Sequence, residues 1–166
     1  FRSDSGTIAI RVQLPAAVSM AHMPRSGSCG LDLYHGQGNQ KKFHGMKLPL
    51  HQGRSEYEKI LVEGWNREKR DWTLNFPLYN GVKQVIVGLD PDAKIELPTP
   101  FTVAKPMLFY GSSITQGAAA SRPGNAYTHI IARRLDANLV NLGFSGGAKG
   151  EPEMASLIAS VDMSVF

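Results

Sequence analysis

The stretch FYGSSITQG, residues 109–117, decides how the second half of this chain is expected to fold. The apolar run before it has the composition of a buried strand, and Gly111 permits a sharp turn where that strand ends. Ser112 and Ser113 would then lie at a sheet edge beside a helix N-terminus, where backbone N–H groups favour negative charge. The stretch is compatible with a serine nucleophile, with a turn stabilised by serine side chains, or with a phosphate-binding loop. The last is disfavoured because Gly117 is followed by Ala instead of Lys.

Strand and helix patterns alternate around this turn. Residues 125–135 carry apolar side chains at helical spacing, with Asn125 as the expected N-cap. Residues 139–142 read as a second apolar strand, residues 152–160 as a second helix that begins with a proline, and residues 165–166 as the start of a third strand. This alternation predicts a parallel sheet, whose ligand-binding edge lies at the carboxyl ends of the strands. The loops after the first two strands are therefore expected to meet at that edge.

The first half of the chain has a different pattern, typical of an all-β domain. Residues 7–14 alternate apolar and polar side chains, as a half-buried strand does. Further short strands follow between turn residues, at 30–34, 57–63, 72–76 and 82–89. This spacing predicts a β-sandwich, jelly-roll-like in form, over residues 1–98. Two prolines within residues 97–100 indicate a stiff connector, so we assign residues 99–104 as a linker and 105–166 as the α/β part.

Composition and charge exclude several classes of function. The 166 residues carry a net charge of +4 and 42% hydrophobic residues, which is ordinary for a globular protein. The basic residues form no dense cluster in the sequence, so binding to nucleic acid is not expected. No apolar run is long enough for a membrane span, and the single Cys29 excludes both a disulfide within the chain and a cysteine-rich zinc site. The histidines have no metal-ligand spacing, and we expect no metal ion.

A second glycine-rich loop follows the second strand of the predicted parallel sheet. Residues 141–147, NLGFSGG, contain three glycines within five residues, which lets the backbone approach a ligand closely and offer N–H donors to an oxyanion. By itself this loop could equally be a flexible turn before the next helix. Two Gly/Ser loops on adjacent strands of one sheet are more informative together than either is alone.

Together these stretches resemble the SGNH hydrolases, also called GDSL-type esterases. Residues 107–117 are similar to the first block of the family, Gly-Asp-Ser-Ile-Thr-x-Gly, and residues 141–146 look like its second block. In the first half, residues 30–34, GLDLY, and residues 76–82, FPLYNGV, resemble the β-rich N-terminal part of one SGNH subgroup, which carries a Gly-x-Asp-Leu-Tyr motif. The resemblance therefore spans nearly the whole chain.

The resemblance implies a flavodoxin-like, three-layer α/β hydrolase domain after the β-sandwich, and a serine esterase that needs no cofactor. It assigns the nucleophile to Ser113 and an oxyanion N–H to Gly146, with the N–H of Ser113 as a further donor. Ser112 stands where the family usually has Asp, a position outside the catalytic triad. The implied substrate is an ester of a small molecule or a glycan, and acetyl esters of carbohydrates are favoured, cleaved through a Ser113 acyl-enzyme.

The main departure from the family pattern is the absence of a base that would activate Ser113. The third block of the family supplies an oxyanion Asn, and the last supplies Asp and His; both would lie after Phe166. We therefore expect a truncated chain that is inactive or nearly so, because a serine hydroxyl without a base is a weak nucleophile. None of the five histidines is expected to replace this base: these are His22, His35, His44, His51 and His129.

In addition to Ser112, two further residues are candidates for a position near the site. Asp32 alternates with leucines in its predicted strand and is expected to have either a role at the junction of the two halves or a purely structural one. Asn125 is either a helix cap or a substrate contact.

The main alternative function is a non-catalytic one. In it, the β-sandwich binds a carbohydrate and the α/β part is a structural appendage. An incomplete sheet with an open edge also favours self-association into a homo-oligomer. The chain begins without a secretory signal, and a periplasmic or secreted location is favoured if the protein acts on polysaccharides.

Overall fold

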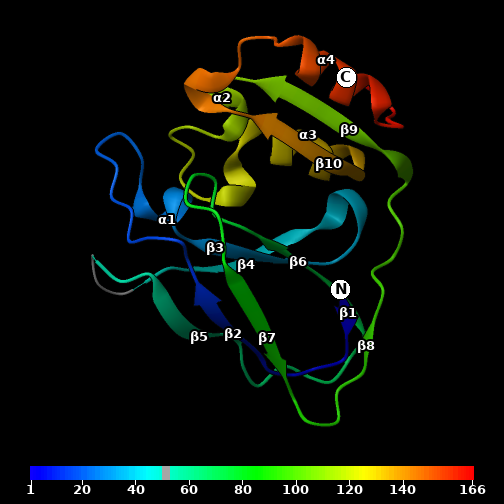
Figure 1. Cartoon of the computed structure of the whole chain (residues 1–166). Helices are drawn as coiled ribbons and strands as arrows, with labels where there is room; N and C mark the ends of the chain where they lie inside the picture. Colours follow the sequence, from blue (N-terminus) through cyan, green and yellow to red (C-terminus); the bar gives the residue numbers. More distant parts are fainter. Residues whose placement is uncertain (50–52) are drawn as a thin grey trace.

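The described residues, 1–49 and 53–166 of a computed structural model, contain two antiparallel sheets and one parallel sheet (Figure 1). The larger antiparallel sheet has the strand order β4-β3-β6-β1-β8, with bounds Lys42–Lys47, Leu31–His35, Arg70–Asn75, Arg2–Ser3 and Ile95–Glu96. The smaller has the order β5-β2-β7, with bounds Glu56–Val62, Ile8–Gln13 and Gln84–Leu89. Two short helical segments, α1 (Arg25–Ser28) and η1 (Gly38–Gln40), lie before and after β3.

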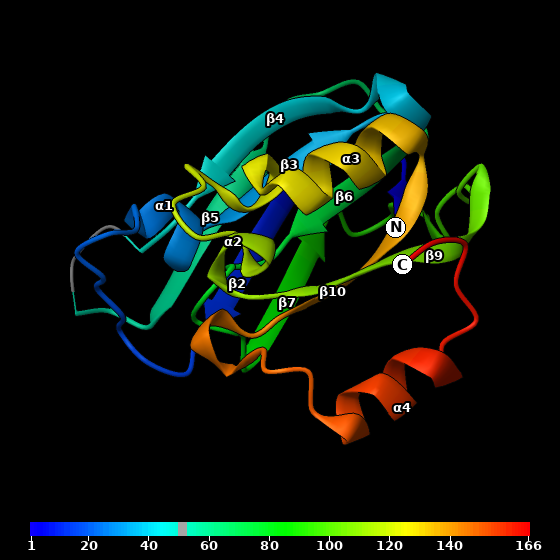
Figure 2. The same cartoon turned by 90° about the horizontal axis from the view of Figure 1, so that it is seen from above.

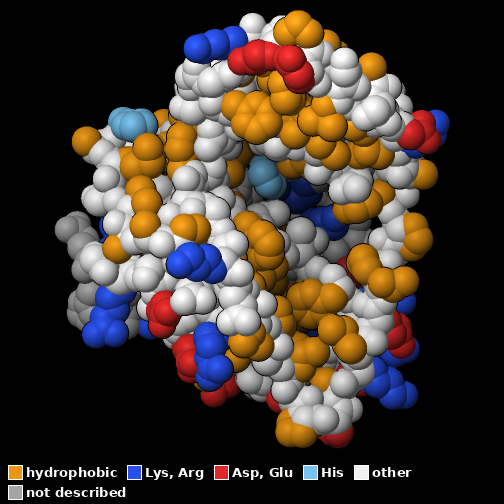
Figure 3. Space-filling model, in the orientation of Figure 1, with side chains coloured by type: hydrophobic (Ala, Val, Ile, Leu, Met, Phe, Trp, Pro, Cys, Tyr) orange, Lys and Arg blue, Asp and Glu red, His pale blue; other side chains and the backbone are white. Residues whose placement is uncertain are grey.

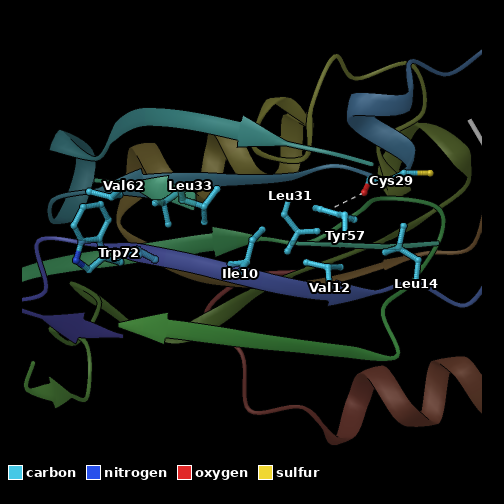
Figure 4. Packing of buried hydrophobic residues seen from close by; sticks show 11 residues of the cluster. Ile10, Val12, Leu14, Cys29, Leu31, Leu33, Tyr57, Val62 and Trp72 are labelled. Carbon is cyan, nitrogen blue, oxygen red and sulfur yellow. Dashed lines mark hydrogen bonds between the residues drawn. The ribbon is translucent and has the colours of Figure 1, made fainter. Parts of the chain in front are cut away.

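The two antiparallel sheets share one apolar core. β2 buries Ile8, Ile10 and Val12 on one face, which is the alternation that the sequence predicts for a half-buried strand. Leu33 of β3 and Trp72 of β6 contribute to the same cluster from the larger sheet. The other buried members are Leu14, Cys29, Leu31, Tyr57, Leu61 and Val62 (Figure 4). Since burying one large apolar side chain contributes about 1.5–3 kcal/mol, this core is the main source of stability in the first half.

The second half of the chain builds the parallel sheet. Its elements are β9 (Val103–Gly111), α2 (Ser113–Gln116), η2 (Pro123–Asn125), α3 (Tyr127–Leu135), β10 (Ala137–Gly143), η3 (Ser145–Gly147) and α4 (Pro152–Ser160). β9 and β10 pair in parallel, and Val165 forms a parallel bridge with Met107 of β9. The helices α3 and α4 lie on opposite sides of the two strands (Figure 2).

The expected mixed fold class is therefore confirmed, and the chain is rich in strands with few helices. The jelly-roll form of the first half and the three-layer, flavodoxin-like arrangement of the second stay predictions, as do the boundaries at 1–98, 99–104 and 105–166. Within the described part of the chain, no helix has both the length and the apolar character needed to cross a membrane.

The predicted N-cap at Asn125 is wrong. Residues 123–125 instead form the separate short helix η2, and Ala126 after it is extended, with φ −59° and ψ 138°. α3 consequently begins at Tyr127 without a side-chain cap. The amide of Asn125 donates to the Ser121 hydroxyl at 2.8 Å. The helix starts late because the N–H of Gly124 bonds to a buried carboxylate from the first half, a contact that local sequence does not reveal.

The linker is fixed at both ends by carboxylates. Asp71 of β6 accepts the N–H of Thr99 at 2.7 Å, the Thr99 hydroxyl at 2.9 Å, and the amide of Gln37 at 2.8 Å. Asp136, which follows α3, accepts the N–H of Thr102 at 2.9 Å and its hydroxyl at 2.7 Å. The connector is therefore attached to the larger sheet at one end and to the α/β half at the other.

The Asp71 contacts make the stability of the protein depend on pH. Burial alone would raise the pKa of Asp71, but the hydrogen bonds from Thr99 and Gln37 outweigh it and hold that pKa below its ordinary value. We expect Asp71→Asn to lower the free energy of unfolding by about 1–3 kcal/mol at neutral pH, because a charge-assisted acceptor is lost. The pKa of Asp71 is lower in the folded protein than in the unfolded chain. The difference in free energy of unfolding between the parent protein and Asp71→Asn is therefore fully present above the unfolded-state pKa of about 3.9, and it is lost as the pH falls through the pKa of the folded state.

Urea unfolding of both proteins between neutral pH and about pH 3 measures this difference. Asp92→Asn is the matched control, since the side chain of Asp92 is 78% exposed and pairs with Arg67 on the surface, so little change is expected. If Asp71→Asn destabilised the protein equally at both ends of the pH range, the pKa of Asp71 would not be depressed in the folded protein.

Candidate active site

Ser113 is the first residue of α2, directly after the turn that ends β9. Ser112 precedes it in an extended conformation, with φ −82° and ψ −153°, and Gly117 ends the helix with a φ of +113°, a conformation that favours glycine. Ser113 is partly exposed and Ser112 is exposed. No hydrogen bond joins the Ser113 hydroxyl to another side chain in the part of the chain that the structure describes. The strand–turn–helix arrangement expected from the sequence is present.

The glycine-rich loop after β10 lies beside this turn. β9 and β10 are in register up to the pair Gly111 and Gly143, so both loops leave the sheet at the same edge. The N–H of Phe144 donates to the carbonyl of Gly111 at 2.9 Å, which ties the two loops together. The next residues form η3, which packs beside α2.

Asn141 joins the elements around the turn, a role that the sequence did not assign to it. Its amide nitrogen donates to the carbonyl of Thr115 in α2 at 2.8 Å and lies 3.1 Å from the hydroxyl of Thr128 in α3. Its carbonyl oxygen accepts the N–H of Gly143 at 2.9 Å. One side chain of β10 therefore fixes α2, α3 and the start of the glycine loop relative to one another.

Gly146 is exposed in η3 and has open space where a side chain would begin. The residue before it, Ser145, has a φ of +51°, which turns the backbone of the loop sharply. The predicted oxyanion donor therefore lies on an accessible loop at the same edge of the sheet as Ser113.

The first half of the chain supports α2 from the other side. The hydroxyl of Tyr79 donates to the backbone carbonyl of Ser113 at 3.1 Å, and the amide of Gln116 donates to the carbonyl of Leu78 at 3.1 Å. Gly117 packs so closely on Leu78 that an added Cβ would lie 2.8 Å from its Cδ1. Leu78 and Tyr79 belong to the segment FPLYNGV, so this stretch contacts the candidate nucleophile's helix.

Asp32 and Tyr34 of the GLDLY segment hold the loop between α2 and α3. The carboxylate of Asp32 is fully buried and accepts the N–H of Gly124 at 2.8 Å, with Arg122 Nη1 at 3.2 Å. Asn75 of β6 donates to the same carboxylate at 2.8 Å. Arg122 also bonds to the hydroxyl of Tyr34, whose ring lies where a side chain at position 124 would begin. Asp32 therefore acts at the junction of the two halves, with no bond to Ser113 among the described residues.

No histidine of the described chain forms a hydrogen bond with Ser113. His129 of α3 lines a small cavity against the larger sheet, and burial lowers its pKa, which favours the neutral form. His35 and His44 pack edge-on against Trp65, with ring centres 5.2 and 4.9 Å from it. His22 lies on an exposed loop, and His51 lies outside the described residues. Over residues 1–49 and 53–166, no three His, Cys, Asp or Glu side chains gather in a way that could hold a metal ion.

Two family models match the chain. The model for the N-terminus of SGNH-hydrolase-type esterases matches residues 1–95, and the model of the GDSL-like lipase/acylhydrolase family matches residues 104–166. The search of curated proteins gave no match.

Two solved structures are similar to the chain. One, described as a GDSL-like lipase from Bacteroides ovatus, is 35% identical, with a TM-score of 0.86 over 98% of this chain and 47% of its own. The other is the salicylyl-acyltransferase SsfX3 from a tetracycline biosynthetic pathway, 21% identical, with a TM-score of 0.70 over 96% of this chain and 43% of its own. The second similarity concerns the fold alone.

The two family models together match residues 1–95 and 104–166, and they define the class of the chain. The protein belongs to the SGNH hydrolases, the GDSL-like lipase and acylhydrolase family, and it carries the N-terminal part of SGNH-type esterases. It spans about half the length of the two solved structures, 47% and 43%.

Because the two loops are in contact, alanine substitutions at Gly143 and Gly146 are predicted to differ in their effect on stability. A Cβ at Gly143 would lie 2.2 Å from the backbone nitrogen of Gln116, so Gly143→Ala must displace α2. We expect it to lower the free energy of unfolding by about 1–3 kcal/mol, the usual cost of overpacking. Gly146→Ala, which meets open space, is the control and should leave thermal and urea unfolding nearly unchanged. Equal effects of the two substitutions would show that α2 is not tightly packed against the glycine loop.

Proposed function

We propose that this chain is part of a serine esterase of the SGNH type that acts on acyl esters, through an acyl-enzyme on Ser113. In the proposed reaction the Ser113 oxygen attacks the ester carbonyl, the alcohol leaves, and water then releases the carboxylic acid and restores the serine. The proton of the serine hydroxyl has to pass to a general base, and no side chain of the described residues forms a hydrogen bond with this hydroxyl. Neither step calls for a metal ion or an organic cofactor.

The observation that carries this proposal is the shared edge of the two loops. Because Gly111 and Gly143 are paired in a parallel register, the serine turn and the glycine loop leave adjacent strands side by side. Parallel sheets bind their ligands at this edge. The bond from Phe144 to Gly111 keeps the loops in contact, so a carbonyl that reaches Ser113 also comes near the N–H groups of η3.

Oxyanion stabilisation is proposed to come from backbone N–H groups. The N–H of Ser113 precedes the first bond of α2, which runs from Gln116 to Ser112, so it is not used inside the helix. Gly146 offers a further N–H on an exposed loop. Preorganised donors of this kind are each worth about 10²–10³ in rate for acyl transfer.

The substrate class is proposed from the family resemblance. Acyl esters, and in particular acetyl esters of carbohydrates, are the favoured substrates, with a jelly-roll domain and a flavodoxin-like layered domain as the two parts of the enzyme. Ser112 and Asn125 are proposed as neighbours of the site and not as reacting groups. The acyl-transfer activity named for SsfX3 belongs to the same kind of carbonyl chemistry as the proposed ester hydrolysis.

The nucleophile is tested by a pair of adjacent serines. In a protein that contains this chain and has the length of the solved relatives, Ser113→Ala is expected to lower the rate of p-nitrophenyl acetate hydrolysis by about 10³-fold or more and to prevent labelling by a fluorophosphonate. Ser112→Ala removes the neighbouring hydroxyl and should keep most of the activity and the label. Full activity in Ser113→Ala would overturn the assignment of the nucleophile.

Residues 1–166 by themselves are expected to hydrolyse the same ester no faster than their own Ser113→Ala variant, because no described residue activates the hydroxyl. A measured rate typical of ordinary serine esterases would contradict this expectation. Retention of a polysaccharide by this chain, together with unchanged activity of the longer protein after Ser113→Ala, would favour the carbohydrate-binding alternative instead.

A further inference from the structure

Two adjoining cavities lie between the larger antiparallel sheet, the linker and α3. The first, of about 660 Å³, lies between the linker and strands β6 and β7. The second, of about 230 Å³, lies between α3 and strands β3 and β6. Lys41, Thr73 and Phe101 line both, so the cavities meet at these residues. Figure 3 shows a hollow on this face, with Lys or Arg and His side chains inside it and hydrophobic side chains around it.

The smaller cavity is lined by two cations, Lys41 and Arg133, and by no carboxylate of the described residues. Lys41 Nζ lies 4.7 Å from the centre of the Phe101 ring and forms no salt bridge within the described chain. Arg133 donates a hydrogen bond to the carbonyl of Gly124 at 3.0 Å, and its guanidinium lies over the Tyr34 ring. Two positive charges therefore converge on one cavity without an acidic partner in its wall.

The acidic residues closest to Lys41 are already used by the linker. Asp71 and Asp136 line the larger cavity, but their carboxylates accept hydrogen bonds from Thr99 and Thr102. Burial lowers the pKa of Lys41 even though both aspartates act to raise it. The ammonium group is thus poorly solvated and incompletely compensated, and an anion entering the cavity would stabilise it.

The remaining wall of the smaller cavity offers neutral hydrogen-bond donors. Thr73, Asn75 and His129 line it; one N–H of the Asn75 amide already donates to Asp32, and burial lowers the pKa of His129, which favours its neutral form. Two cations with neutral donors suit the two oxygens of a carboxylate, which accepts several hydrogen bonds at once.

The larger cavity differs in its chemistry. Trp72, Leu74, Phe76, Val85 and Val87 give it an apolar wall on the side of the β-rich half. Its volume falls within the roughly 300–1,000 Å³ of ordinary small-molecule sites. A molecule whose charged end contacts Lys41 could therefore extend an apolar body along this wall.

We propose that the paired cavities form a binding site for a small organic acid, with its carboxylate between Lys41 and Arg133 and its apolar body beneath the linker. The site is distinct from the proposed nucleophile. Asp136 and the first residue of β10, Ala137, mark the amino end of the parallel sheet, whereas Ser113 follows the carboxyl end of β9. Binding there can be tested without any esterase activity.

The test uses the chain itself and the fluorescence of Trp72. The protein has two tryptophans, and Trp65→Phe leaves Trp72, which lines the larger cavity, as the only one. Titration with hexanoate is expected to change the emission of Trp72 to saturation. Hexanamide, which has the same body without the charge, should bind at least tenfold more weakly, as should acetate, which lacks the body. Absence of a saturable change, or equal binding of hexanoate and hexanamide, would overturn the proposal.

Neighbouring basic residues give matched variants. Lys41→Gln and Arg133→Gln are each expected to weaken hexanoate binding about tenfold or more. The exposed neighbours Lys42→Gln and Arg134→Gln remove the same charge and should bind hexanoate as the parent protein does. Circular dichroism and thermal unfolding show whether each variant is folded, and Lys41→Gln keeps the test decisive if Arg133→Gln, which loses the bond to Gly124, is unstable. Equal weakening in all four variants would mean that net charge alone attracts the acid, which contradicts a site.

Discussion

The buried carboxylate of Asp32 is the constraint on which the relation between the two halves depends. An ionised carboxylate that is fully removed from water is unfavourable by several kcal/mol unless charged or polar groups surround it. Asn75 supplies one such group from the same sheet, but Arg122 and the N–H of Gly124 come from the α/β half. The β-rich half therefore leaves this charge insufficiently compensated until the loop between α2 and α3 is in place. Docking of the two halves therefore completes the set of donors around Asp32, which gives a physical reason for the Asp and Tyr of the Gly-x-Asp-Leu-Tyr segment.

This docking also determines how the serine turn is held. The loop fixed by Asp32 connects α2 to α3, while Leu78 and Tyr79 contact α2 directly. α2 has only four residues, too few to be stable alone, so its position has to come from such tertiary contacts and from Asn141 beneath it. The β-rich half is thus a structural part of the candidate site. This argues against a β-sandwich that merely accompanies an independent α/β unit.

The sequence predicted those elements whose signal is local. The alternation in β2, the buried end of β9 and the proline that begins α4 were each readable from a few neighbouring residues. β1 and β8 were missed because two residues carry no periodicity, and β4 because Gly45 interrupts its pattern. The cap expected at Asn125 failed for a different reason, since its loop is shaped by Asp32 some ninety residues earlier in the chain. The same limit applies to the Tyr79 contact with Ser113: a family motif indicated that the segment mattered, but only the fold shows what it touches.

The two edges of the parallel sheet have separate physical roles. At the carboxyl edge the backbone is tightly turned and rich in glycine, which leaves N–H groups unused and a serine partly exposed. At the amino edge the same strands are attached to the linker, whose threonines donate hydrogen bonds to Asp71 and Asp136, while the wall of the smaller cavity holds Lys41 and Arg133 and no carboxylate of the described residues. The two aspartates act on Lys41 through their charge but form no salt bridge with it among the described residues, and burial outweighs them and lowers the pKa of Lys41. An anion in the smaller cavity would add to this partial compensation, and the apolar wall of the larger cavity would favour an anion that carries an apolar body.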